Sequence, residues 1–285
     1  LTMFKYTTPL GIWVPPTPLW YGKHPHLLKP TEQSLAVSIT NSSVFRPGGP
    51  TGRPQLGFRR TDLIAQINWD ASATKPIFCQ GKKAFHFSIL KDSIRQLNLK
   101  HEYQIVFIEP SDGSHVFGVQ IGSPFTNPTG KLPAKDAGHL KILDHSLNVL
   151  FHVPLVDLVW QNFAVIVDWD KRTLQVFHSA GPAPLKQVTG VKKNLSAKVG
   201  EEGWGEFHIG LLKVLERGIK GRRNMLTVDM IAVAFVNPKD APENQGNVVY
   251  YGIQEGTTEG LIYSGVFVED LKDGLSIGNG KTLRV

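Results

Sequence analysis

Short runs of alternating apolar and polar residues recur along most of the chain and predict β-strands. Successive side chains of a strand point to opposite faces, so an alternating run of about four to eight residues indicates a half-buried strand. Hairpin turns are expected at 111–114 and 168–172, and a short helix only near 154–159 or 214–218. The predicted strands are 57–69, 83–90, 101–109, 115–122, 139–144, 148–153, 162–169, 173–178, 206–212, 226–236, 247–254 and 261–268.

Residues 1–56 follow a different pattern, because prolines interrupt almost every stretch in which regular structure could form. We expect this segment to be irregular and packed onto the core, with one strand at 35–39. The chain has no internal repeat, low-complexity tract or evident linker, so we expect a single domain over 1–285. Many short strands and few helices favour an all-β fold, an antiparallel β-sandwich of jelly-roll type.

Composition excludes several function classes. The chain has 285 residues and a net charge of +7, yet Lys and Arg are dispersed, and their densest cluster, 213–223, lacks interleaved aromatics. No nucleic-acid partner is therefore predicted. No apolar run reaches the roughly 18 residues of a membrane span. Cys79 is the single cysteine, which excludes an internal disulfide. No metal-ligand, phosphate-loop or dinucleotide pattern is present, so we expect no metal and no cofactor.

Two acidic residues stand out because each lies in a strand-like run among other polar side chains. Arg60 and Asp62 share one face of the run 57–69, and Glu102 and Gln104 share one face of the run 101–109. Two carboxyls on a polar sheet face are what acid–base cleavage of a glycosidic bond requires. The other interpretation is a solvated outer face with scattered charge.

Further polar residues could extend this face. If 83–90, 101–109 and 115–122 pair as a meander, His86 and Gln120 join Glu102 and Gln104 on a surface suited to saccharide hydroxyls, unless it is simply a solvated sheet. Gln254 and Glu255 lie in a polar, glycine-flanked loop. They are candidates for substrate contact, although a plain turn with solvated charge also fits.

Several blocks together resemble fungal glycoside hydrolase family 131. They are Phe-Arg-Arg-Thr-Asp-Leu at 58–63, and the stretches 85–92, 97–104, 251–256 and 259–267. The resemblance implies a secreted β-glucanase of broad linkage specificity, with a jelly roll of concanavalin-like type and an open cleft. It also implies two catalytic carboxylates working by inversion. Glu102 matches the second, and Asp62 stands where the family usually has Glu.

The expected function is therefore cleavage of β-1,3-, β-1,4- or β-1,6-glucans by a secreted glycoside hydrolase. Asp62 and Glu102 are the expected catalytic pair. Arg60 is expected to orient a neighbouring carboxylate or lower its pKa. Because Asp is one methylene shorter than Glu, a non-catalytic, lectin-like β-glucan-binding protein is the alternative. The positive charge keeps a third hypothesis open, a lyase or binder acting on anionic polysaccharides.

Overall fold

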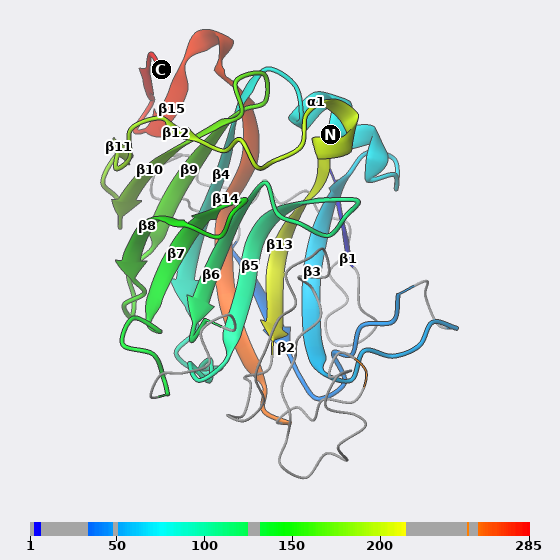
Figure 1. Ribbon diagram of the computed structural model, residues 1–285. Coiled ribbons are helices and arrows are strands. Elements are labelled where there is room, and N and C mark those ends of the chain that lie inside the picture. The colour runs from blue at the N-terminus through cyan, green and yellow to red at the C-terminus, as the bar shows by residue number, and fades with distance from the viewer. Residues whose placement is uncertain (1–2, 7–33, 48–50, 125–131, 215–249, 251–255) are drawn as a thin grey trace.

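The computed structural model describes residues 3–6, 34–47, 51–124, 132–214, 250 and 256–285. In this part of the chain, two antiparallel sheets stack face to face (Figure 1). The first sheet has seven strands, in the order β1 (Met3–Tyr6), β3 (Phe58–Gln66), β13 (Gly205–Val214), β5 (Glu102–Pro110), β6 (Phe117–Gly122), β7 (His139–Asp144) and β8 (Val149–Pro154).

The second sheet lies behind the first. Its order is β11 (Lys186–Gln187), β10 (Thr173–Ala180), β9 (Gln161–Asp168), β4 (Lys82–Lys91), β14 (Glu259–Asp270) and β2 (Leu35–Ile39), and β12 (Lys192–Lys193) also pairs with β10. β15 (Leu275–Gly278) and β16 (Lys281–Leu283) form a separate hairpin. Helical structure within the described ranges is limited to α1 (Lys75–Phe78) and short 3₁₀ turns at Ser72–Thr74, Gly200–Gly203 and Leu271–Asp273.

The main core lies between the two sheets and is formed by every second side chain of the strands that face each other. Phe85 of β4 contacts Phe207 of β13 at a ring-centroid distance of 5.0 Å and Phe117 of β6 at 5.8 Å. These rings join the two sheets. A smaller cluster, including Phe177 and Leu275, lies on the outer face of the second sheet beside the C-terminal hairpin. Both faces of the second sheet are therefore partly covered, whereas the outer face of the first sheet carries the polar residues described below.

The all-β antiparallel sandwich expected from the sequence is confirmed, and most predicted strands appear within a residue or two of their expected bounds. The run 226–236 lies outside the described residues, as does 247–254 except for Tyr250. Residues 1–56 contain β1 as well as the predicted β2. The helix expected near 154–159 is absent, since 155–160 is a turn between β8 and β9, and the alternative at 214–218 lies outside the described residues after Val214, which ends β13. The helix found is α1, which has Pro76 in its first turn.

The meander considered for 83–90, 101–109 and 115–122 is found only in part: β5 pairs with β6, but β4 does not join them. β4 pairs with β9 and β14 in the second sheet, and β13 lies between β3 and β5 in the first. Alternation tells which residues share a face of a strand, but it does not tell which sheet the strand joins.

Cys79 is buried against the carbonyl of Gly205, and burial raises the pKa of its thiol to about 11, which makes it an inert core residue. None of the helices in the described ranges is long and apolar enough to cross a bilayer.

Candidate active site

Asp62 is the centre of a charged cluster on the outer face of the first sheet. Its carboxylate Oδ2 accepts a hydrogen bond from Arg60 Nη2 at 2.8 Å and one from His208 Nδ1 at 2.6 Å. Burial acts to raise the pKa of Asp62, but Arg60 and His208 outweigh it and hold that pKa well below its usual range. Asp62 is therefore held in its ionised form, and Arg60 contacts this carboxylate as the shared strand face predicted.

Asp62 is also more enclosed than the sequence suggested. Its side chain is 1% exposed and that of His208 is 3% exposed. An ionised carboxylate can only accept hydrogen bonds, so Nδ1 of His208 carries the shared proton and Nε2 is left as the acceptor of the neutral ring. Any proton transfer from water to this cluster is therefore more readily made through Nε2 of His208 than directly to Asp62.

Two further carboxylates lie beside that nitrogen. Nε2 of His208 is 3.7 Å from Glu109 Oε2 and 3.9 Å from Glu206 Oε2, and both glutamates reach the surface. Arg60 also lies 3.5 Å from Glu109. Burial acts to lower the pKa of Arg60, and Asp62 and Glu109 together raise it. The cluster thus connects a buried ionised carboxylate through an imidazole to carboxylates that contact solvent.

Aromatic stacking fixes the plane of the His208 ring. Phe107 lies parallel to His208 on one side, at 4.7 Å, and to His115 on the other, at 4.3 Å. Burial and the nearby His208 and Arg60 lower the pKa of His115 to about 3, so this ring is neutral at ordinary pH. The stack restricts rotation of His208 and keeps Nδ1 directed at Asp62.

Glu102 forms a second cluster on the same face. Its Oε1 accepts hydrogen bonds from the side-chain amides of Gln104, at 3.0 Å, and Gln120, at 3.2 Å. Tyr103 and Ile105 belong to the core, so alternation places Glu102 and Gln104 on the outer side. Because both amides donate to Oε1, a proton on a neutral Glu102 would be carried by Oε2.

β13 separates the two clusters. Asp62 pairs with Gly210 and Glu102 pairs with Val214, on opposite sides of this strand. Their backbones are therefore about 10 Å apart across the sheet and offset by about 13 Å along β13. Leu212 lies between them, opposite both Arg60 and Gln104. The structure thus brings Asp62, Glu102, Arg60, Gln104 and Gln120 onto one face, which we call the polar face, together with His208.

Gly210 allows Asp62 to approach β13 closely. A β-carbon at this position would overlap Thr61 O and the Cα and Cβ atoms of Asp62. β13 is also irregular here, since its register against β5 shifts between Ile209 and Leu212. Behind the strand, Tyr263 of the second sheet donates its hydroxyl proton to Gly210 O. The position of Asp62 therefore depends on a glycine of the neighbouring strand.

A buried ion pair supports the sheet beneath Glu102. Lys213 Nζ lies 2.7 Å from Glu259 Oε1, and both side chains are almost fully buried between the sheets. Thr257 and Tyr103 also donate hydrogen bonds to Glu259. Since Tyr103 follows Glu102 in β5, this network anchors the backbone that carries Glu102.

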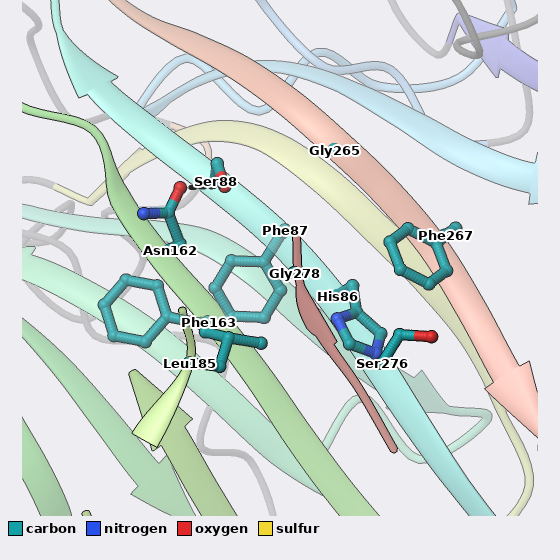
Figure 2. Close-up of a pocket in the computed structure, with 10 residues that line it drawn as sticks. All are labelled: His86, Phe87, Ser88, Asn162, Phe163, Leu185, Gly265, Phe267, Ser276 and Gly278. Carbon is teal, nitrogen blue, oxygen red and sulfur yellow. Dashed lines mark hydrogen bonds between the residues drawn. The ribbon is translucent and has the colours of Figure 1, made fainter. Parts of the chain in front are cut away.

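The expectation that His86 joins the polar face was wrong. His86 lies on β4 in the second sheet, where it stacks on Phe267 at 4.1 Å and contacts Glu269 Oε2 through Nε2 at 3.0 Å. It lines a small pocket with Ser88 and Asn162, whose side chains hydrogen-bond to each other (Figure 2). Burial lowers the pKa of His86 despite Glu269. This pocket opens on the side of the second sheet away from Asp62 and Glu102.

The remaining predicted residues are Gln254 and Glu255, which lie outside the described residues. Within the described ranges, no group of three or more His, Cys, Asp or Glu side chains is placed to hold a metal ion. The sequence reasoning missed His208, Glu109 and Glu206. Alternation within the predicted strand 206–212 places Glu206, His208 and Gly210 on one face, and this signal could have identified Glu206 and His208. Glu109 could not be found in this way, because the register of β5 shifts between Gln104 and Val106.

Comparisons with known proteins agree with this architecture. The chain is similar in structure to a GH131 β-glucanase catalytic domain from Podospora anserina, with a TM-score of 0.58 and 20% identity over 87% of this chain and 75% of that one. It is also similar to the catalytic domain of a glycoside hydrolase family 131 protein from Coprinopsis cinerea, with a TM-score of 0.54 and 19% identity over 87% and 73% of the two chains. At these identities the likeness shows the fold.

No curated protein matches the chain by sequence. A family model does: the glycoside hydrolase 131 catalytic N-terminal domain matches residues 17–274, which include both acidic clusters and nearly all of the sandwich. The chain therefore belongs to glycoside hydrolase family 131.

Proposed function

We propose that this protein hydrolyses β-glucans, with Asp62 and Glu102 as its carboxylate pair and His208 as the group that completes the base. The observation that carries the proposal is the asymmetry of the two clusters on the polar face. Asp62 is held ionised by Arg60 and His208, whereas Glu102 accepts hydrogen bonds from the neutral amides of Gln104 and Gln120. Such a difference in environment is how glycosidases separate an acid from a base.

The asymmetry assigns the two roles. A carboxylate with a strongly lowered pKa cannot deliver a proton, so Asp62 belongs to the base side. It holds the Nδ1 proton of His208, and Nε2 accepts a proton from the attacking water. Glu102, protonated on Oε2, gives its proton to the glycosidic oxygen as the bond to the anomeric carbon breaks. Water attacks from the face opposite the leaving group, so the anomeric configuration inverts. This mechanism requires the acid and the base to lie about 6.5–9.5 Å apart across the bound sugar, closer than the backbones of Asp62 and Glu102.

Substrate binding follows from the same side chains. Gln104 and Gln120 are planar amides whose second hydrogen-bonding groups suit sugar hydroxyls, and they already orient Glu102. Of the two solved relatives described above, the one from Podospora anserina is named a β-glucanase. We propose β-1,3-, β-1,4- and β-1,6-glucans as the substrate class. Because such polymers are extracellular, we also propose that the protein is secreted, which its recovery from culture medium would test.

A second candidate function is a non-catalytic, lectin-like β-glucan-binding protein. The observation that favours it is the burial of Asp62 and His208, which restricts the access of water to the base. The same polar face would then bind glucan without cleaving it.

One panel of assays separates these functions. Purified protein is incubated with β-1,3-, β-1,4- and β-1,6-glucan and with a polyuronate, and reducing ends and retained protein are measured. Release from a β-glucan, with the product anomer inverted by NMR, supports the hydrolase. Binding to β-glucan without release supports the lectin-like function. Cleavage or binding of the polyuronate alone contradicts both and favours the anionic-polymer hypothesis.

A further inference from the structure

Trp69 is an unusual side chain on the described surface outside the polar face. It is 66% exposed, and no other Trp, Tyr or Phe with a described side chain is comparably exposed. A large exposed apolar ring is unfavourable in water, although a single one is not rare on a protein surface. Exposure alone therefore does not mark a site, and the backbone at this position is the more informative feature.

Trp69 occupies a position where a glycine would be favoured. Ile67 and Asp70 exchange both backbone hydrogen bonds, at 3.0 and 2.9 Å, and Asn68 and Trp69 between them have φ values of +50° and +68°. This is a two-residue turn with two left-handed residues, for which Asn-Gly is the preferred sequence. Asn tolerates that conformation, but a bulky residue such as Trp rarely adopts it. At this position a tryptophan is therefore disfavoured both by its exposure to water and by its backbone conformation.

The turn is also held firmly. The Asp70 carboxylate accepts hydrogen bonds from the backbone N–H of Ser72, at 2.8 Å, and from its hydroxyl, at 2.6 Å. Contacts of this kind fix the exit of the turn. An aromatic ring on a preformed turn loses little conformational freedom when it binds a ligand. The arrangement therefore suits a rigid platform better than a mobile loop residue.

The turn directly continues the strand that carries Asp62. Trp69 is seven residues beyond Asp62, so at most about 23 Å of extended chain separates them. Figure 1 shows the loop that follows β3 running beside α1 at one end of the first sheet. β3 continues as regular strand for four residues beyond Asp62, to Gln66, which places the turn roughly 13 Å or more away from it. A long polymer bound on the polar face could therefore extend to this end of the sheet, whereas one or two sugar rings bound beside Asp62 would not reach Trp69.

We infer that Trp69 is a glucan-binding platform, separate from the polar face, that holds polymeric substrate by stacking on a pyranose ring. A β-linked glucose ring presents C–H groups on its faces, and the negative face of an indole attracts them. The choice of glucan as the ligand rests on the proposed function. The inference adds that the protein discriminates polymer from short oligosaccharide through this one side chain.

The test compares Trp69→Gly, Trp69→Leu and Trp69→Tyr with the wild type. Leu158→Gly is a matched control, because Leu158 is also an exposed apolar residue (87%) with a positive φ (+61°), in a turn between β8 and β9. Depletion isotherms on insoluble β-1,3- and β-1,4-glucan particles give the affinity. Turnover is measured on the same particles and on a short soluble β-gluco-oligosaccharide, and the melting temperature is recorded for each protein.

Trp69→Gly should bind particles about tenfold more weakly, equivalent to about 1.4 kcal/mol. Its ratio of particle to oligosaccharide turnover should fall by a similar factor. Trp69→Leu should behave in the same way, and Trp69→Tyr should keep most of the affinity. Both glycine variants should melt at a higher temperature than the wild type, since each relieves a left-handed non-glycine residue, but Leu158→Gly should bind normally.

Particle binding by Trp69→Gly within twofold of the wild type would overturn the inference, as would an equal loss in Leu158→Gly. The result is independent of catalysis. If the wild type releases no sugar but binds particles in a Trp69-dependent way, the hydrolase proposal fails and the platform stands. If particles are bound and cleaved normally with Trp69 replaced, the platform fails and the hydrolase stands.

Discussion

The substitution Asp62→Asn tests the base that the polar face assembles. It preserves the shape of the side chain but removes the charge that lies 2.8 Å from Arg60 and 2.6 Å from His208. Both hydrogen bonds end on the same oxygen, Oδ2, so an amide oxygen in its place can still accept from Arg60 and from His208. Without the negative charge, however, nothing stabilises the imidazolium that forms when Nε2 takes the proton of the attacking water. His208 is then a much weaker base.

The size of the effect follows from the burial of the cluster. Loss of a general base, or of the charge that supports it, typically lowers turnover by about 10²–10⁴-fold. Removing one partner of a buried ion pair costs roughly 3–5 kcal/mol, and we expect about 3 kcal/mol because Arg60 keeps Glu109 at 3.5 Å. A domain with ordinary stability survives this loss. The variant should therefore fold, melt at a lower temperature and turn over glucan very slowly.

The assay is reducing-end release from β-glucan at saturating concentration, beside a denaturant titration. His208→Gln is the companion variant, and the double variant should lose little more than either single one because the two residues act as a unit. Activity of Asp62→Asn within tenfold of the wild type, in a folded protein, would refute the base assignment. Fully additive losses in the double variant would refute the coupling to His208.

Four further predictions follow. The pKa of Asp62 is depressed in the folded state, so its stabilising effect is complete above the unfolded value near 3.9 and is lost as pH falls below about 4; acid titrations should show this loss in the wild type and a shallower one in Asp62→Asn. Gly210→Ala should cost about 1–3 kcal/mol in denaturant titrations and lower turnover, because the new methyl group displaces Asp62. Glu259→Gln should cost roughly 3–5 kcal/mol in the same titrations, since it leaves Lys213 buried without its counter-charge. His86→Leu should leave glucan turnover within twofold, because His86 lies on the second sheet, away from the polar face. A large loss of turnover would contradict a role for His86 outside the active site.

The sequence predicted those features that depend on a single strand. Alternation correctly placed Arg60 with Asp62 and Glu102 with Gln104, because the side chains of one strand keep their period whatever sheet the strand joins. The assignment of Gln120 to the same face also held, since β5 and β6 are joined by a short hairpin and pair directly.

The errors arose where the pairing of strands is long-range. β4 follows β3 in sequence but crosses to the second sheet, which moved His86 to another side of the molecule. β13 lies more than a hundred residues from β3 and inserts beside it, which brought His208 to within hydrogen-bonding distance of Asp62. Local periodicity carries no information on either event. The burial of Asp62 likewise results from its neighbours and not from its own strand.

The central claim is that a carboxyl at Glu102 supplies the proton for glycosidic cleavage. The most direct test is the rate of cleavage by Glu102→Gln, measured with two substrates whose leaving groups differ in their need for protonation. The substitution keeps the size of the side chain and removes its acidic proton. The account predicts a loss of about 10²–10⁴-fold on β-glucan, and a much smaller loss on an aryl β-glucoside whose phenolate leaves without a proton. Equal losses on both substrates, or β-glucan turnover close to that of the wild type, would contradict it.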